Sequence, residues 1–362
     1  FFVQSDAAAA NGIANEIPVW FAPNPIEHPE SYGMRTFLHV DWVTPGNSTF
    51  TAPPAIQVTE FDSALCGLSS FYCIGKPGVP QGNPSSLDPL REPVMYRFVY
   101  RNFGGHEALV GNLATDVNGA DLAGIRWFEL RGTGNAWGLH QEGTYSLDSV
   151  NRWMGSIAMD GSGNIALGYS VSNSSSVFPG LRYAGRLAGD PLGTLPQGEA
   201  SIFEANANNG SNRWGDYASM SVDPVDDCTF WYTQEYFKVT SGNWATRVGS
   251  FKFPSCGLPK GWIEGTGYNA ATLAGIPGVP VVAEGPITTL TVETDATGHY
   301  AMILPGDTYT LTAGPLLPGY PNPATVDGVA VTAGSTTTVD IPLTGLPFLA
   351  EDAVTIDDDV AG

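Results

Sequence analysis

The stretch Asn212-Arg-Trp-Gly-Asp-Tyr-Ala-Ser-Met-Ser-Val-Asp223 decides the fold class, because two other segments repeat its pattern. Asn151-Arg-Trp-Met-Gly-Ser-Ile-Ala-Met-Asp160 likewise places Arg-Trp before an alternating apolar run that ends at an aspartate, and Val94-Met-Tyr-Arg-Phe-Val-Tyr-Arg-Asn-Phe103 is a looser copy. A second alternating segment follows each of the two closer copies, at residues 164–172 and 228–236. A recurring strand–turn–strand unit is typical of a radial or stacked β array.

Glycine and proline interrupt the chain too often for long helices, since the sequence holds 44 Gly and 28 Pro in 362 residues. We therefore expect an all-β protein, with a β-propeller over residues 1–258. The spacing of Arg97, Arg152 and Arg213 leaves room for only a few blades, and a ring that fails to close exposes unpaired sheet edges. Two readings stay open: the ring is small, or it is incomplete at the N-terminus because blades lie upstream of Phe1.

The composition of the sequence changes after Cys256-Gly-Leu-Pro-Lys-Gly261, where aromatic residues become less frequent and Thr and Val dominate. Short alternating segments between frequent turns predict a small β-sandwich over residues 259–345. Residues 346–362 are acidic and predict either a linker or the start of a further module.

The charge balance restricts the class of partner. The chain carries 36 Asp and Glu against 15 Lys and Arg, for a formal net charge of −21 at pH 7. Such a surface repels phosphate backbones and anionic headgroups, which excludes nucleic acid as a partner. No apolar stretch is long enough to span a bilayer, so we expect no membrane insertion. The acidity fits either solubility outside a cell or binding of a divalent cation.

Four cysteines form two close pairs in the sequence, Cys66 with Cys73 and Cys228 with Cys256. Four cysteines allow three pairings, and the local one costs the least loop-closure entropy. Because no Cys-x-x-Cys spacing or nearby histidine pair is present, a zinc site is the weaker alternative. Disulfides indicate an oxidising compartment, so we expect a secreted or cell-surface protein.

The repeated arginines Arg97, Arg152 and Arg213 have two readings. Three convergent guanidinium groups hold a carboxylate well, such as that of sialic acid, if the first strand of each unit directs them into a central funnel. Alternatively, each arginine bridges two neighbouring blades through a carboxylate or a backbone carbonyl. Repetition at equivalent positions favours the bridging role.

Asp216, Glu235 and Tyr236 suggest one form of catalysis. A Tyr–Glu pair with an Asp acid suits glycoside hydrolysis through a tyrosine nucleophile. The competing interpretation is that Asp216 pairs with an arginine while the tyrosines pack between blades. Glu199 and Glu204 offer a further carboxylate pair, whose separation the sequence does not define.

Two acidic turns, at residues 160–164 and 223–227, occupy matching places in successive units. Asx-turn geometry accounts for the aspartates there. Calcium binding is the alternative, because several carboxylates and turn carbonyls can converge on one hard cation. The candidate ligands are Asp160, Asp223, Asp226 and Asp227.

The segment Arg213-Trp-Gly-Asp-Tyr-Ala-Ser-Met-Ser-Val-Asp-Pro-Val-Asp-Asp-Cys-Thr-Phe-Trp-Tyr-Thr-Gln-Glu-Tyr236, with Gly155-Ser-Ile-Ala-Met-Asp160 before it, resembles the sialidase-like (BNR-type) propeller region of large secreted bacterial proteins. The resemblance covers roughly residues 90–256 and implies a β-propeller, and most such proteins have no assigned activity. The Ser-x-Asp-x-Gly-x-x-Trp motif of true sialidases does not occur in the sequence.

A second resemblance lies in Gly275-Ile-Pro-Gly-Val-Pro-Val-Val-Ala283, Thr294-Asp-Ala-Thr-Gly-His-Tyr300 and Pro305-Gly-Asp-Thr-Tyr-Thr-Leu311. These segments look like a carboxypeptidase regulatory-like (transthyretin-like or Cna-B-like) domain, which is an accessory β-sandwich and not a catalyst. In this reading Asp295 and Gly298 shape a tight turn, and Tyr300 and Tyr309 fill the core.

Two functions follow from these patterns. The first is a non-catalytic role in extracellular recognition, adhesion or self-assembly, with a glycan, a protein or a second copy of the chain as partner. The alternative is a sialidase-like glycoside hydrolase that acts on extracellular glycans. An enzyme requires arginines and a carboxylate pair free of bridging partners, whereas a scaffold uses the same groups in bridges.

Overall fold

The computed structural model describes residues 16–19, 31–32, 36–39, 49–51, 56–68, 70–91, 94–96, 98–133, 136–208, 210–216, 218–237, 244–314, 320 and 322–345. The chain divides into two compact units, Phe1–Gly257 and Leu258–Gly362. Arg97 and the acidic segment 346–362 lie outside the described residues. Within the described part, no helix is long and apolar enough to cross a membrane.

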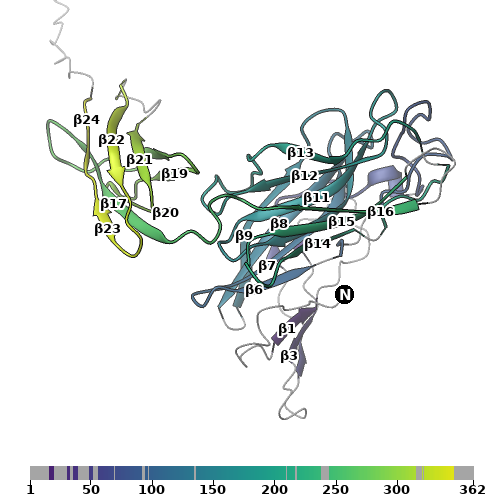
Figure 1. Cartoon of the computed structure of the whole chain (residues 1–362), viewed down its shortest axis with the longest axis horizontal. Coiled ribbons are helices and arrows are strands. Elements are labelled where there is room, and N and C mark those ends of the chain that lie inside the picture. The colour runs from purple at the N-terminus through teal and green to yellow at the C-terminus, as the bar shows by residue number, and fades with distance from the viewer. Residues whose placement is uncertain are drawn as a thin grey trace, which may run out of the picture. The chain divides into compact units, whose positions relative to one another are not determined.

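Three consecutive antiparallel sheets make up most of the first unit, and each follows the order of the chain. Figure 1 labels their strands apart from β10. The first sheet contains β6 (Val99–Asn102), β7 (Glu107–Asp116), β8 (Ala123–Thr133) and β9 (Ala136–Tyr145). The second contains β10 (Asn151–Met159), β11 (Ile165–Ser172), β12 (Gly180–Arg186) and β13 (Glu199–Phe203). The third contains β14 (Ser219–Val222), β15 (Phe230–Phe237) and β16 (Trp244–Phe251).

Smaller elements precede these sheets. A three-stranded sheet joins β1 (Glu16–Val19), β3 (Thr36–His39) and β4 (Thr49–Thr51), and β2 (Ser31–Tyr32) pairs with β5 (Ile56–Gln57). A short 3₁₀ turn, η3 (Leu65–Leu68), opens the long connection that leads to β6.

Burial patterns show how the three large sheets pack. Every residue of β10 and β11 is buried, which is the pattern of strands covered on both faces. The strand β15 instead alternates between buried and more exposed residues, as a strand covered on one face does. The second sheet therefore lies between the other two, and the third sheet buries one face against it.

Hydrogen bonds join the first strands of the three sheets. The Met220 amide in β14 donates to Ser156 Oγ in β10 at 2.8 Å, and Arg101 at the end of β6 reaches the carbonyl of Met159 at the end of β10 at 3.1 Å. Arg101 also pairs with Asp227 in the turn after β14, so the first strands of the three sheets end at the same edge of the unit. The described residues confirm the all-β class. No complete ring of sheets forms among them, and the propeller therefore remains a prediction.

Two disulfides hold loops of the first unit. Cys66 is bonded to Cys73, and Cys228 is bonded to Cys256, so both cysteine pairs are local in the sequence. The described cysteines include no free thiol. The second bond ties the turn after β14 to the last residues of the unit.

The second unit consists of two sheets with a shared core. One contains β17 (Lys260–Asn269), β20 (His299–Pro305), β23 (Thr336–Thr338) and β24 (Ile341–Leu343). The other contains β18 (Pro280–Glu284), β19 (Thr289–Glu293), β21 (Thr308–Ala313) and β22 (Ala324–Ala330). Buried residues of both sheets form one cluster, as in a β-sandwich. Tyr300 and Tyr309 are buried in it, and their hydroxyls donate to the carbonyls of Val339 and Pro305.

Candidate functional site

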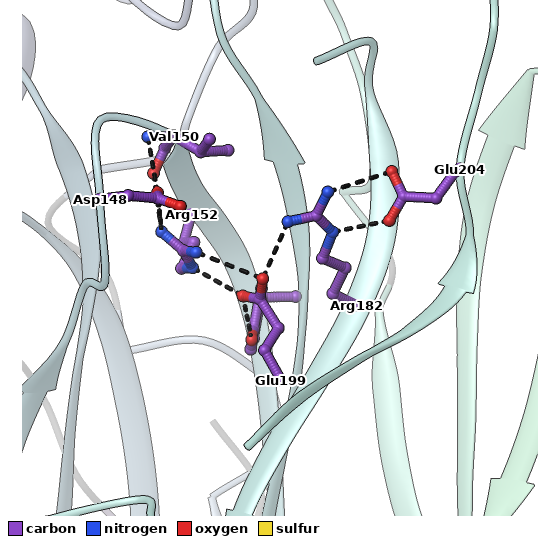
Figure 2. Close-up of polar contacts among 7 residues, drawn as sticks. Asp148, Val150, Arg152, Arg182, Glu199 and Glu204 are labelled. Atoms are coloured by element: carbon purple, nitrogen blue, oxygen red, sulfur yellow. Dashed lines mark hydrogen bonds and ion pairs between the residues drawn. The ribbon is translucent and has the colours of Figure 1, made fainter.

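A chain of alternating charges runs across the second sheet. Arg152 in β10 donates to both carboxylate oxygens of Glu199 in β13, at 2.8 and 3.3 Å. Arg182 in β12 donates to Glu199 at 2.8 Å and to both oxygens of Glu204 at 2.6 and 3.2 Å. Figure 2 shows Glu199 between the two guanidinium groups. We call Arg152, Arg182, Glu199 and Glu204, with Tyr169, the Glu199 network.

The guanidinium group of Arg152 directs no N–H donor toward solvent. Its side chain is 0% exposed, and its Nη1 donates to Asp148 at 3.0 Å and to the Val150 carbonyl at 2.9 Å. Burial alone lowers the pKa of Arg152, but the hydrogen bonds and charges of Glu199 and Asp148 outweigh burial and raise it. A buried cation with this many partners is held by the protein itself.

The strand register explains why these groups meet. Arg182 lies directly opposite Tyr169 of β11, and Arg152 lies opposite Val171 in the same strand. Residues two apart in a strand share a face, so all three side chains project from one side of the sheet. The same side packs on the first sheet, where Tyr145 lies 5.7 Å from Tyr169 between ring centroids.

Tyr169 completes the network and limits its chemistry. Its hydroxyl donates to Glu199 Oε2 at 2.7 Å, and its side chain is buried. Burial, followed by the nearby Tyr145 and Glu199, raises the pKa of Tyr169 far above its usual range. A tyrosine nucleophile must reach the substrate and lose its proton, and burial disfavours both.

Arg213 belongs to a different group of charges. It donates to Asp88 Oδ2 at 2.7 Å and to Asp216, and 48% of its side chain is exposed. Asp88 is buried in the connection before β6, and burial raises its pKa despite the neighbouring arginine. Arg152 and Arg213 share no carboxylate partner in the described structure, so they do not converge on one anion.

Glu235 and Tyr236 do not form a pair. They are neighbours in β15, and adjacent residues of a strand point to opposite faces. Tyr236 is buried toward the second sheet, where its ring lies 4.5 Å from that of Phe203. Glu235 faces the other way and accepts a hydrogen bond from the Gly215 amide at 3.3 Å. Burial, aided by the charge of Asp216, raises the pKa of Glu235.

The aspartates of the two acidic turns bind groups of their own turns. Asp160 is buried and accepts from the amides of Ser162 and Asn164 and from the Asn164 side chain. Burial raises its pKa to about 6, although these hydrogen bonds act in the opposite direction. In the second turn, Asp226 accepts three hydrogen bonds from Cys228 and Thr229, which lower its pKa to about 2.

Asp223 accepts hydrogen bonds from groups of its own hairpin, whereas Asp227 contacts a residue of the first sheet. Asp223 accepts from the Val225 amide and from the indole nitrogen of Trp231, both within its own hairpin. Asp227 pairs with Arg101 of β6, at 2.6 and 2.5 Å. Within the described ranges, no three His, Cys, Asp or Glu side chains gather as a metal site would need.

Arg101 is the connecting residue that sequence reasoning missed. It joins β6, the end of β10 and the turn after β14 through its bonds to Met159 and Asp227. The turn at 160–164 packs closely there: the Gly161 amide donates to the Asp227 carbonyl, and a Cβ at Gly161 would lie 2.2 Å from an Asp227 oxygen. The signal was present, because Arg101 sits near the end of the loosest repeat and the acidic turns end the other two.

Comparison with known proteins adds no assignment. No protein-family model matches the chain, and no curated protein matches it. The two resemblances noted in the sequence therefore remain resemblances.

Proposed function

We propose that this chain is a secreted or cell-surface, non-catalytic β protein that serves extracellular recognition, adhesion or self-assembly. The two disulfides and the acidic composition support an oxidising, extracellular setting. Its partner is an extracellular glycan or protein, or a second copy of the chain, and the net charge of −21 disfavours nucleic acid.

One observation carries the non-catalytic part of the proposal. Arg152 is fully buried, and it shares Glu199 with Arg182 and Tyr169, so the charges that would bind a substrate carboxylate already bind one another. An anion-binding site needs donors directed at an empty position, and an arginine shared between internal carboxylates does not supply them. These groups therefore hold the second sheet together.

The fold assignments that we propose are finer than the all-β class. The three sheets are chain-ordered meanders whose first strands end at one edge and pack in succession, which supports a β-propeller segment over residues 1–258. The two-sheet core of the second unit supports a carboxypeptidase regulatory-like sandwich over residues 259–345. An experimental structure of the whole chain tests both, since a propeller requires the sheets to turn about one axis.

Binding and assembly are tested together. The purified chain is applied to a glycan array with and without a chelator, and its mass is measured by light scattering over a range of concentrations. We expect binding to at least one class of glycan, or a mass that rises with concentration. A monomer that binds no glycan on the array removes the glycan and self-assembly forms of the proposal, and loss of binding with chelator assigns a role to calcium.

A sialidase-like glycoside hydrolase is the second candidate. The Tyr169–Glu199 hydrogen bond between two arginines is the observation that supports it, and the burial of Tyr169 counts against it. A Tyr–Glu pair beside arginines is the arrangement that a tyrosine-nucleophile mechanism uses. The test is hydrolysis of a fluorogenic sialoside and of neutral aryl glycosides by the wild type and by Tyr169→Phe. Turnover that Tyr169→Phe abolishes establishes this candidate, and no turnover by the wild type removes it.

A further inference from the structure

The third sheet has one face that points away from the second sheet. Tyr232 and Gln234 of β15 point toward the second sheet: Gln234 donates to Ser170 Oγ at 2.9 Å, and a Cβ at Gly168 would touch the ring of Tyr232. The alternate residues of β15, beginning with Trp231, point the other way. We call the side of β14, β15 and β16 that carries Trp231 the outer face.

The strand register places hydroxyls and aromatic rings together on the outer face. Trp231 lies between Ser221 of β14 and Ser250 of β16. Further along the strand, the cross-strand neighbours on the same face are Ser219, Thr233 and Val248, then Glu235 and Thr246, and finally Phe237 and Trp244. Between the two tryptophans the face therefore carries serine and threonine hydroxyls together with Val248, Glu235 and Phe237. The ring of Phe237 stacks on the buried Trp214. Figure 1 labels the three strands that form the face.

Both indoles are accessible, and one is held in place. Trp231 is 41% exposed and Trp244 is 65% exposed. The Trp231 indole nitrogen donates to Asp223 Oδ2 at 3.0 Å, which restrains the ring while it remains exposed. A restrained aromatic ring binds with less loss of conformational entropy than a mobile side chain.

The composition of the outer face argues against burial under another sheet. The strands of the second sheet that are covered on both faces carry mostly apolar residues, with Ile157, Ile165 and Leu167 in the core. The outer face instead presents serine and threonine hydroxyls, whose desolvation without partners is costly. Sugar hydroxyls supply such partners, and the apolar faces of sugar rings match exposed indoles.

We propose that the outer face of β14, β15 and β16 binds a neutral polysaccharide chain that lies along the strands between Trp231 and Trp244. This inference rests on the proposed recognition function and names its ligand class. A neutral ligand is favoured over an anionic one because the chain carries a net charge of −21 and Glu235 lies within the face.

The spacing of the two indoles sets the size of the ligand. Trp244 lies opposite Phe237, six residues along β15 from Trp231, which corresponds to about 20 Å at about 3.3 Å per residue. No single sugar ring contacts both indoles across that length. We therefore expect affinity to rise with the length of the oligosaccharide until the ligand spans both rings.

Affinity gel electrophoresis tests the inference. The full chain is run through gels that contain xyloglucan, glucomannan, laminarin or dextran, with alginate as the polyanionic comparison. We expect at least one neutral polysaccharide to retard the wild type, and Trp231→Ala and Trp244→Ala each to weaken retardation at least about tenfold in dissociation constant. The matched control is Trp262→Ala, which removes a tryptophan that is 42% exposed in the second unit and leaves retardation unchanged.

The outcomes separate the inference from the function on which it rests. Retardation that persists in both variants places the glycan site elsewhere, which overturns the inference and leaves the recognition function standing. If no polysaccharide retards the wild type, but its mass rises with concentration and Trp244→Ala prevents this, the face is a contact between copies and the inference fails. A chain that neither binds polysaccharide nor assembles overturns the inference, and it removes the glycan and self-assembly forms of the proposed function. Both tryptophans are exposed, so we expect each alanine variant to fold, and circular dichroism checks that it does.

Discussion

Arg101 and Asp227 form an ion pair although 126 positions separate them in the sequence, with Arg101 Nη2 at 2.6 Å from Asp227 Oδ1. The same arginine donates to the Met159 carbonyl, so one side chain joins the ends of β6 and β10 to the turn after β14. The arginine side chain is 15% exposed and the aspartate 54%. The pair thus sits at the edge of the unit, partly accessible to water.

Replacing Arg101 with Ala is expected to lower the unfolding free energy of the first unit by about 1–2 kcal/mol. Hydrogen bonds to charged groups contribute about 1.5–3 kcal/mol, and the exposure of Asp227 reduces that value. Urea unfolding followed by tryptophan fluorescence reports on this unit, because Trp262 is the one tryptophan of the sequence beyond residue 257. As control, Lys252→Ala removes a side chain that is 56% exposed and 3.7 Å from Asp226, and is expected to change stability by less than about 0.5 kcal/mol. Equal effects of the two changes would contradict the bridging role of Arg101.

The Glu199 network is expected to respond as a buried ion cluster. Replacing Arg152 with Met removes a fully buried cation and leaves Glu199 with fewer partners, at a cost of about 3–5 kcal/mol in unfolding free energy. Combining it with Glu199→Gln gives a coupling energy on the order of 1–3 kcal/mol in a double-mutant cycle, because the two groups contact each other. Arg247→Met, at an exposed position of β16, is the matched control. Independent, additive effects of the two changes would refute the network.

Asp160 is expected to make the first unit less stable as the pH rises from about 4 to about 6. Burial raises the folded-state pKa of Asp160 from 3.8 to about 6, so the folded chain binds this proton more tightly than the unfolded chain does. The stabilising contribution is fully present below pH 3.8 and is lost as the pH rises through 6, for a total of at most about 3 kcal/mol. The measured quantity is the difference in unfolding free energy between the wild type and Asp160→Asn at several pH values. A difference that stays constant over this interval would show that Asp160 does not titrate there.

The two disulfides are expected to contribute unequally. Cys228–Cys256 closes a loop with a sequence separation of 28, and Cys66–Cys73 closes one of 7. In the chain-entropy model the longer loop stabilises by about 3–4 kcal/mol and the shorter one by about 2 kcal/mol. Replacing each pair with serines and measuring urea unfolding gives the two values. A larger loss from the shorter loop would show that native contacts, rather than loop entropy, determine the order.

The strands of this protein could be predicted well from the sequence, because their alternation is local. The segments expected as strands at 164–172 and 228–236 are β11 and β15 almost residue for residue. The all-β class followed from the same patterns and from the frequent turns. The ring of blades stays a prediction, since closure depends on contacts between sheets that no local pattern encodes.

The candidate site was harder to predict, because its partners are distant in the chain. The repeat identified Arg152 and Arg213, but the sequence could not show that the first binds Glu199, 47 positions away, and the second binds Asp88, 125 positions away. Glu235 and Tyr236 suggested a catalytic pair because they are adjacent in sequence. They do not form one, because adjacent residues of a strand point to opposite faces of the sheet. The Asx-turn interpretation was correct for Asp160, Asp223 and Asp226. Each of these aspartates accepts a hydrogen bond from a backbone amide two positions further along the chain.

Binding without catalysis is the central claim, and one measurement addresses it directly. The wild-type chain is incubated with the neutral polysaccharide that retards it most strongly, and both bound protein and newly formed reducing ends are measured in the same samples. We predict saturable binding with no increase in reducing ends over the protein-free control. Reducing ends that increase in proportion to protein concentration and incubation time would contradict the claim.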